Sequence, residues 1–232
     1  MEPNKVVASA RARVRDAVRA EIVAAARAQL ATEGAGSLSL RAVARELGMA
    51  SSAVYRYFAS RDDLLTELII EAYDSLGAKV ETAAVTGRGA VEHWRHACRA
   101  VRAWALARPT EYALIYGSPV PGYEAPELTV GPASRTILAL AGILVEAYGA
   151  GEVIEDPSVP LSRSLESEAS ALAELALPGV PPAIVARGIV AWNQLFGQVS
   201  FEVFGQLRGV IQDTDAFFDF SVDAMGRFVG FR

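Results

Sequence analysis

The polar residues best suited to binding chemistry lie in one short stretch of this 232-residue chain, from Ser39 to Asp63. Small, hydroxyl-bearing and cationic side chains follow one another there: Ser51, Ser52, Ala53, Tyr55, Arg56 and Tyr57. Small residues let a backbone approach base edges, and serine can donate to or accept from any base. Tyrosine hydroxyls and guanidinium groups bind phosphates. The stretch therefore predicts a DNA-contacting surface, provided that short helices hold it in place.

The first of two such helices is predicted just before the polar run. Val43, Ala44 and Leu47 fall on one face at helical spacing. Ser39 precedes them as the expected N-cap, accepting a backbone N–H bond through its hydroxyl. Gly48 stands where a left-handed residue usually ends a helix.

The second helix is predicted over roughly residues 51–58, with Val54 and Phe58 facing inward. Residues 48–50 alone separate the two helices, which is the turn length of a helix-turn-helix. The alternative is a helical hairpin that packs without touching DNA, but it leaves two exposed tyrosines without a purpose.

A third helix is predicted to begin at Ser60, because Ser60 and Asp63 have the spacing of a capping box. Its N-terminus and Arg61 together favour a phosphate. For base readout we expect Ser51, Ser52, Ala53 and Arg56. For phosphate contacts we expect Ser39, Tyr55, Tyr57 and Arg61. Arg41 could serve either purpose.

These motifs resemble the tetracycline-repressor (TetR) family of bacterial transcription regulators. The resemblance covers roughly residues 19–68, and it is carried by Ile22, Ala26, Glu33-Gly34, Ser39-Leu40-Arg41-Ala42-Val43-Ala44, Leu47-Gly48, Val54-Tyr55-Arg56-Tyr57-Phe58 and Ser60-Arg61-Asp62-Asp63-Leu64-Leu65. Arg61 departs from the family's usual lysine, although both bind phosphate. The resemblance implies an all-α protein, with a three-helix DNA-binding domain over 1–60 and a helical effector-binding and dimerisation domain over 61–232.

The charge distribution agrees with a localised DNA-binding face. Residues 1–60 hold nine basic against five acidic residues, whereas residues 61–232 hold thirteen against twenty-two, so the net charge of −5 hides a basic head. The longest clearly apolar run, 137–145, is too short to span a bilayer, and the N-terminus does not resemble a signal peptide. We therefore expect a cytoplasmic protein that does not bind membranes.

Helical periodicity continues through most of the chain. Residues 1–10 lack periodicity and are expected to be irregular. Arg11, Arg13, Arg15 and Arg19 could form an arm on DNA or a solvated tail. Helices are predicted at about 14–33, 61–85, 90–107, 109–116, 133–148, 163–177, 183–206 and 213–228.

The resemblance implies that the second domain binds an effector. We expect a mainly apolar small molecule, because apolar pockets with a few polar groups are the usual ligand sites. The predicted lining is Trp94, Cys98, Tyr112, Tyr116, Asn193, Gln194 and Phe196. Residues 192–197 also resemble the subgroup named for a tryptophan–histidine–glycine C-terminal domain, with Phe196 in place of the histidine. The helix over 61–85 is the expected lever between ligand and DNA.

The last two helices are predicted to form a homodimer, because they are apolar almost all round. The expected contacts are Ile189, Trp192, Val199, Val203, Phe217, Phe220, Met225 and Phe228. A two-fold dimer places two recognition helices on a palindromic operator.

Other chemistry is weakly supported. His93 and His96 could hold a metal, but no thiolate or carboxylate supports them, and we expect no metal or cofactor. The single cysteine, Cys98, is expected to be a buried apolar residue. No catalytic pattern is present, so an enzyme is not expected. The alternative to a ligand-responsive repressor is a helical small-molecule or partner-binding protein without operator recognition.

Overall fold

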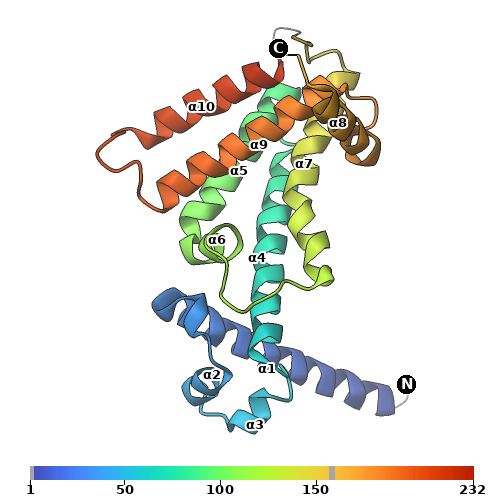
Figure 1. The fold of residues 1–232 in the computed structure, drawn as a ribbon. Helices are drawn as coiled ribbons and strands as arrows, with labels where there is room; N and C mark the ends of the chain where they lie inside the picture. Colours follow the sequence, from blue (N-terminus) through green and yellow to red (C-terminus); the bar gives the residue numbers. More distant parts are fainter. Residues whose placement is uncertain (1–2, 157–159) are drawn as a thin grey trace. The chain divides into compact units, whose positions relative to one another are not determined.

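The computed structural model describes residues 3–156 and 160–232 (Figure 1), and within them the expected all-α architecture is confirmed. The α-helices are α1 (Pro3–Glu33), α2 (Leu40–Glu46), α3 (Ser51–Val54), α4 (Arg61–Ala83), α5 (Ala90–Ala107), α6 (Pro109–Tyr116), α7 (Val130–Gly149), α8 (Arg163–Ala176), α9 (Pro182–Val203) and α10 (Thr214–Val229). Two short 3-10 turns are η1 (Ala35–Ser37) and η2 (Glu127–Thr129). An isolated antiparallel bridge joins Val153 to Phe231.

The chain forms two compact units that do not follow the expected boundary at residue 60. The DNA-binding unit runs to Ala72 and also takes residues 110–129. Two contacts explain this addition: Arg27 Nε lies 3.0 Å from Glu111 Oε1, and the Thr66 and Tyr123 hydroxyls are 2.9 Å apart. The body unit contains residues 73–109 and 130–232. Helix α4 therefore contributes residues to both units.

Helix α1 begins at Pro3, so the prediction of an irregular segment to residue 10 is wrong from that point on; Met1 and Glu2 lie outside the described residues. Proline favours the first position of a helix because its φ is already helical and its missing N–H is not needed there. Further along α1, Ile22, Ala26 and Leu30 are buried and form the core of the DNA-binding unit.

The helix-turn-helix has the predicted glycine turn. Gly48 adopts φ 64°, the Gly48 N–H donates to Arg45 O, and the Met49 N–H donates to Ala44 O, which is a Schellman ending. The prediction for the Ser39 side chain is wrong. Ser39 is the N-cap residue of α2, but its hydroxyl makes no capping bond, and its own N–H donates to Gln29 Oε1.

The body unit is built around α5, which packs against α7, α9 and α10. Trp104, Leu195 and Phe218 are among its fully buried side chains. Helices α9 and α10 lie side by side along α5 (Figure 1). Most predicted helix bounds agree within a few residues, but α7 begins three residues early, at Val130, and α9 ends three residues early, at Val203.

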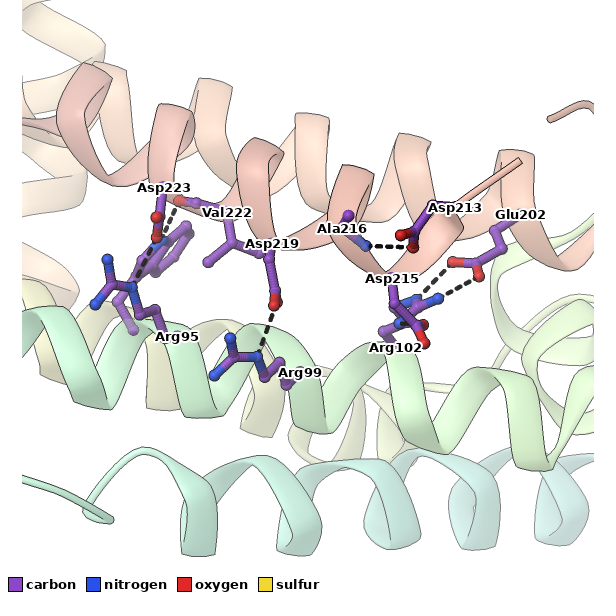
Figure 2. Close-up of polar contacts among 11 residues, drawn as sticks. Arg95, Arg99, Arg102, Glu202, Asp213, Asp215, Ala216, Asp219, Val222 and Asp223 are labelled. Atoms are coloured by element: carbon purple, nitrogen blue, oxygen red, sulfur yellow. Dashed lines mark hydrogen bonds and ion pairs between the residues drawn. The ribbon is translucent and has the colours of Figure 1, made fainter. Parts of the chain in front are cut away.

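A ladder of ion pairs joins α5 to α10 (Figure 2). Arg95 pairs with Asp223 at 2.7 Å and Arg99 with Asp219 at 2.9 Å. The two arginines lie one turn apart on α5 and the two aspartates lie one turn apart on α10, so the pairs follow one another along the contact between the helices.

Helix α7 and the turn before it are long and apolar enough to cross a membrane by length and composition alone. The segment Glu127–Gly149 has 23 residues and a mean hydropathy of 1.6. Several of its apolar side chains instead pack on α5 and α9 or face a cavity. Of its most apolar window, 28% is buried inside the protein, so packing within the body unit accounts for part of this hydrophobicity.

Candidate DNA interface and ligand cavity

The predicted DNA-contacting residues form an open surface on α2, α3 and the turn that follows. Arg41, Ser51, Ser52, Tyr55 and Arg56 are exposed. Ser39, Ala53 and Tyr57 are partly exposed. Val54 and Phe58 are buried, as predicted, and anchor this surface. The regular part of α3 is shorter than expected, since it ends at Val54, but the N–H groups of Tyr57 and Phe58 still donate to Val54 O.

The capping box at the start of α4 is confirmed. The Asp63 N–H donates to Ser60 Oγ and the Ser60 N–H donates to Asp63 Oδ2, both at 3.0 Å. These reciprocal bonds satisfy two backbone donors that a helix start otherwise leaves open. They fix where the recognition segment ends and α4 begins.

Arg61 is bound within the protein. Its guanidinium donates to Ala35 O at 2.9 Å, Leu38 O at 3.2 Å and Gly36 O at 3.4 Å. It therefore binds two carbonyl groups of η1 and that of Leu38, in the turn that leads into α2. This geometry supports a role in positioning α2, and the phosphate contact expected for Arg61 stays a prediction.

Two side chains that hold the recognition segment and α2 in place, Arg19 and Gln29, were not identified from the sequence. Arg19 forms an ion pair with Glu67 at 2.7 Å, donates to Tyr57 O at 3.5 Å, and lies 4.4 Å from the Phe58 ring centroid. Gln29 is buried, accepts from the Ser39 N–H and donates to Ser37 O. A glutamine inside the apolar stripe of α1 was a visible signal, because buried amides need partners. Arg19 gave no such signal within its run of arginines.

An apolar cavity of about 570 Å³ lies within the body unit, between α7, α8 and α9 and beside the C-terminal residues. Its lining is Trp94, Ser134, Ile137, Leu138, Leu140, Ala141, Leu144, Leu172, Leu175, Ala176, Leu177, Val185, Gly188, Ile189, Trp192, Val229 and Phe231. None of these side chains is ionisable. Leu138 and Leu175 are 52% and 82% exposed, so the mouth of the cavity is also apolar.

The predicted ligand residues mostly lie elsewhere. Trp94 lines the cavity, and its indole N–H donates to Val222 O. Cys98 and Phe196 are buried outside the lining, whereas Asn193 and Gln194 are exposed. Tyr112 and Tyr116 belong to the DNA-binding unit, where their ring centroids are 5.2 Å apart. Aromatic content alone did not distinguish a core side chain from a cavity wall.

A cluster of charges links the cavity wall to α4. Arg135, next to Ser134 on α7, donates to both Glu81 carboxylate oxygens at 2.8 and 2.6 Å and to Asp74 Oδ1 at 2.7 Å. These bonds raise the pKa of Arg135 and lower the pKa of Glu81. A Cβ on Gly77 would lie 2.7 Å from Arg135 Cβ, so glycine is needed for this close contact.

Helices α9 and α10 carry exposed apolar residues on adjoining surfaces. Phe201 on α9 is 54% exposed and Phe220 on α10 is 63% exposed. A groove of about 270 Å³ joins the two helices and includes Phe201 and Phe217. Gly197 also lines it, and a Cβ there would meet no atom within 4 Å.

The predicted dimer residues divide into three groups. Phe220 and Phe228 are exposed, while Val203 and Phe217 are partly exposed. Val199 and Met225 are buried within the chain's own core, so they are not available to a partner. Ile189 and Trp192 line the cavity. A helix that is apolar all round is buried on one face by its own chain, and the sequence did not show which face that is.

The described residues bring no three metal-ligating side chains together. His93 is buried with its Nδ1 3.6 Å from Glu146 Oε2. Cys98 is fully buried, and burial raises the pKa of its thiol well above the ordinary value, which keeps it protonated and unreactive.

A short helix, a glycine turn and an exposed recognition helix on an all-helical body define a helix-turn-helix transcriptional regulator. Two family models match: "Bacterial regulatory proteins, tetR family" over residues 22–68, and "Tetracyclin repressor-like, C-terminal domain" over residues 94–225. The chain therefore belongs to the tetR family of DNA-binding transcriptional regulators, and it is not an enzyme. Its placement in the tryptophan–histidine–glycine subgroup stays a prediction.

Similar proteins cover nearly the whole chain. It is 39% identical to the HTH-type transcriptional regulator Rv1816 of Mycobacterium tuberculosis over 212 residues. The aligned region covers 88% of this chain and 89% of that protein. The regulator Mb1846 of Mycobacterium bovis matches equally. The crystal structure of SCO4313 is 35% identical, with a TM-score of 0.76 over 92% of this chain and 97% of that one.

Proposed function

We propose that the protein is a ligand-responsive repressor that binds a palindromic operator as a homodimer in the cytoplasm. An uncharged, mainly apolar effector releases it. The observation that carries this proposal is the apolar cavity, which lies in the same unit as the exposed α9 and α10 surface.

Operator recognition is assigned to the exposed surface of the helix-turn-helix. Ser51, Ser52, Ala53 and Arg56 are proposed to read bases. Ser39, Tyr55 and Tyr57 are proposed to hold phosphates, and Arg41 does either. Exposure of these side chains on one short segment supports the assignment. Arg61 is proposed to position α2, since its guanidinium is bound to three carbonyl oxygens.

The homodimer is proposed to form through the outer faces of α9 and α10. Large exposed aromatic side chains on adjoining helices mark interaction sites, because their transfer from water is favourable. The bare surface at Gly197 allows a partner helix to approach closely. Two helices from each subunit give a four-helix interface about a two-fold axis, which suits a palindrome.

The effector chemistry follows from the cavity wall. A volume of about 570 Å³ is in the range of small-molecule sites. A buried carboxylate or ammonium group would find no ionisable partner in the lining, and burying an unpaired charge is costly. The Trp192 indole N–H makes no hydrogen bond among the described residues, so it is available to a neutral acceptor.

Coupling to DNA is proposed to pass from α7 to α4 through Arg135. Ligand bound against Ser134 and Ile137 shifts α7, and the bidentate bond to Glu81 transmits that shift to α4. The ligand prefers the conformer in which the recognition helices are mis-spaced, so it lowers operator affinity by its difference in affinity for the two states.

A neutral lipophilic dye tests this proposal. Nile red should bind with increased fluorescence and weaken binding to the gene's own upstream DNA, as measured by fluorescence anisotropy. Ala141→Phe fills the cavity and should abolish both effects, whereas Gly142→Phe places the same bulk where a Cβ meets no neighbour and should preserve both. Equal dye binding by the two variants would show that the cavity is not the ligand site.

A further inference from the structure

Helix α1 is much longer at its N-terminus than the matched DNA-binding domain. It begins at Pro3, whereas the family match begins at Ile22. Arg11, Arg13 and Arg15 lie on this extension and are exposed. They form no ion pair within residues 3–156 and 160–232, and Asp16 is the single acidic residue between positions 11 and 20.

The helical register aligns part of this charge with the recognition segment. Arg11, Arg15 and Arg19 are spaced four residues apart, so they follow one stripe of α1. Arg19 contacts the recognition segment directly, through Tyr57 O and the Phe58 ring. The other two arginines therefore continue from the helix-turn-helix toward the N-terminus, along the same side of α1.

The side chains of this stripe line an open hollow on the surface of α1. A hollow of about 490 Å³ is lined by Arg11, Ala12, Arg15, Asp16 and Arg19. Eight residues separate Arg11 from Arg19, which is about 12 Å along a helix, or three to four steps of a DNA strand at about 3.4 Å each. The Asp16 carboxylate lowers the local positive charge and Arg19 is paired with Glu67, so Arg11 and Arg15 supply the unpaired guanidinium groups around the hollow.

We propose that Arg11 and Arg15 bind backbone phosphates of the duplex that flanks the bases read by the helix-turn-helix. The extension lengthens the contact with DNA at each half-site. The extension is expected to contact phosphates and not bases. Guanidinium groups bind phosphates through their charge, and such contacts do not depend on the DNA sequence. The inference rests on operator binding by the helix-turn-helix.

Salt dependence provides the test. The variant Arg11→Gln/Arg15→Gln is compared with Arg88→Gln/Arg163→Gln, which removes the same charge from exposed sites in the body unit. Anisotropy titrations use the gene's own upstream DNA over a range of salt concentrations. Each lost phosphate contact should flatten the plot of log affinity against log salt by about 0.9, so the α1 variant should lose about 1.8 in slope for each half-site. The control variant should keep the wild-type slope.

Duplex length separates this inference from operator binding itself. One duplex spans the protected region found by footprinting, and a second is trimmed by four base pairs at each end. Wild type should bind the longer duplex more tightly, and the α1 variant should bind both equally, with unchanged helical circular dichroism. Equal wild-type affinity for the two lengths, or an unchanged slope in the α1 variant, overturns the inference while operator binding stands. If wild type binds neither duplex, both operator binding and the inference are overturned. If the arginines bind anionic vesicles and their loss does not change DNA binding, the inference is contradicted as well.

Discussion

Loss of Arg102 should destabilise the protein far more than loss of Arg99, although both arginines lie on α5 and form ion pairs (Figure 2). Arg102 donates to both Glu202 carboxylate oxygens, at 2.7 and 2.6 Å, and their side chains are 14% and 10% exposed. Arg99 and Asp219 are 49% and 51% exposed. Removing one partner of a buried pair costs about 3–5 kcal/mol because the other charge stays unpaired. An exposed pair contributes about 0–1 kcal/mol.

Urea unfolding followed by circular dichroism measures this difference. With an m-value of about 3 kcal/mol/M, Arg102→Leu should lower the midpoint by about 1–1.7 M, and Arg99→Leu by less than about 0.3 M. All proteins are compared at one protomer concentration, because association would otherwise shift the apparent stability.

The double variant Arg102→Leu/Glu202→Leu distinguishes an unpaired charge from lost packing. Removing Glu202 as well eliminates the buried charge, so the midpoint should recover most of the loss. A double variant as unstable as Arg102→Leu would refute the electrostatic reasoning. Equal effects of Arg102→Leu and Arg99→Leu would refute the argument from burial.

Three further predictions concern other parts of the chain. Hydrogen bonds from arginines on α5 lower the pKa values of Asp219 and Asp223 below the ordinary 3.8. The contribution of these two carboxylates to folding stability is therefore present above that pH and is lost as the pH falls through the lowered values. Urea midpoints measured between pH 5 and 2 should show this decline. Ser60→Ala removes the capping bond and should cost about 0.5–2 kcal/mol in thermal unfolding, whereas Ser60→Thr should cost less. Phe220→Asp should produce a folded monomer near 24.6 kDa by light scattering, and an unchanged dimer mass would exclude this residue from the interface.

Local patterns predicted the DNA-binding unit well because its signals act over a few residues. The capping box needs only Ser60 and Asp63, and the Schellman ending needs only Gly48, since glycine alone adopts that backbone conformation without strain. The α5 bounds, Ala90–Ala107, were predicted to the residue for the same reason: Gly89 and Pro109 stand beside its two ends.

Contacts between distant segments were not predictable from these patterns. The sequence predicted a phosphate contact for Arg61, but it gave no sign that this side chain also binds carbonyl groups 23 to 26 residues earlier. Residues 110–129 joined the DNA-binding unit through Glu111 and Tyr123, which carry no local sign of that pairing.

The sequence by itself determined the class of fold, the helix-turn-helix and its exposed polar residues, because helical periodicity and turn chemistry depend on neighbours along the chain. Only the tertiary structure decided which apolar residues form the core, the cavity wall or an open face. Val199, Trp192 and Phe220 were all predicted as dimer contacts because they are apolar. In the structure Val199 is buried, Trp192 lines the cavity and Phe220 is exposed. The physical reason is that burial depends on which helices pack on each face, and that packing joins segments more than 100 residues apart, as Trp94 and Val222 illustrate.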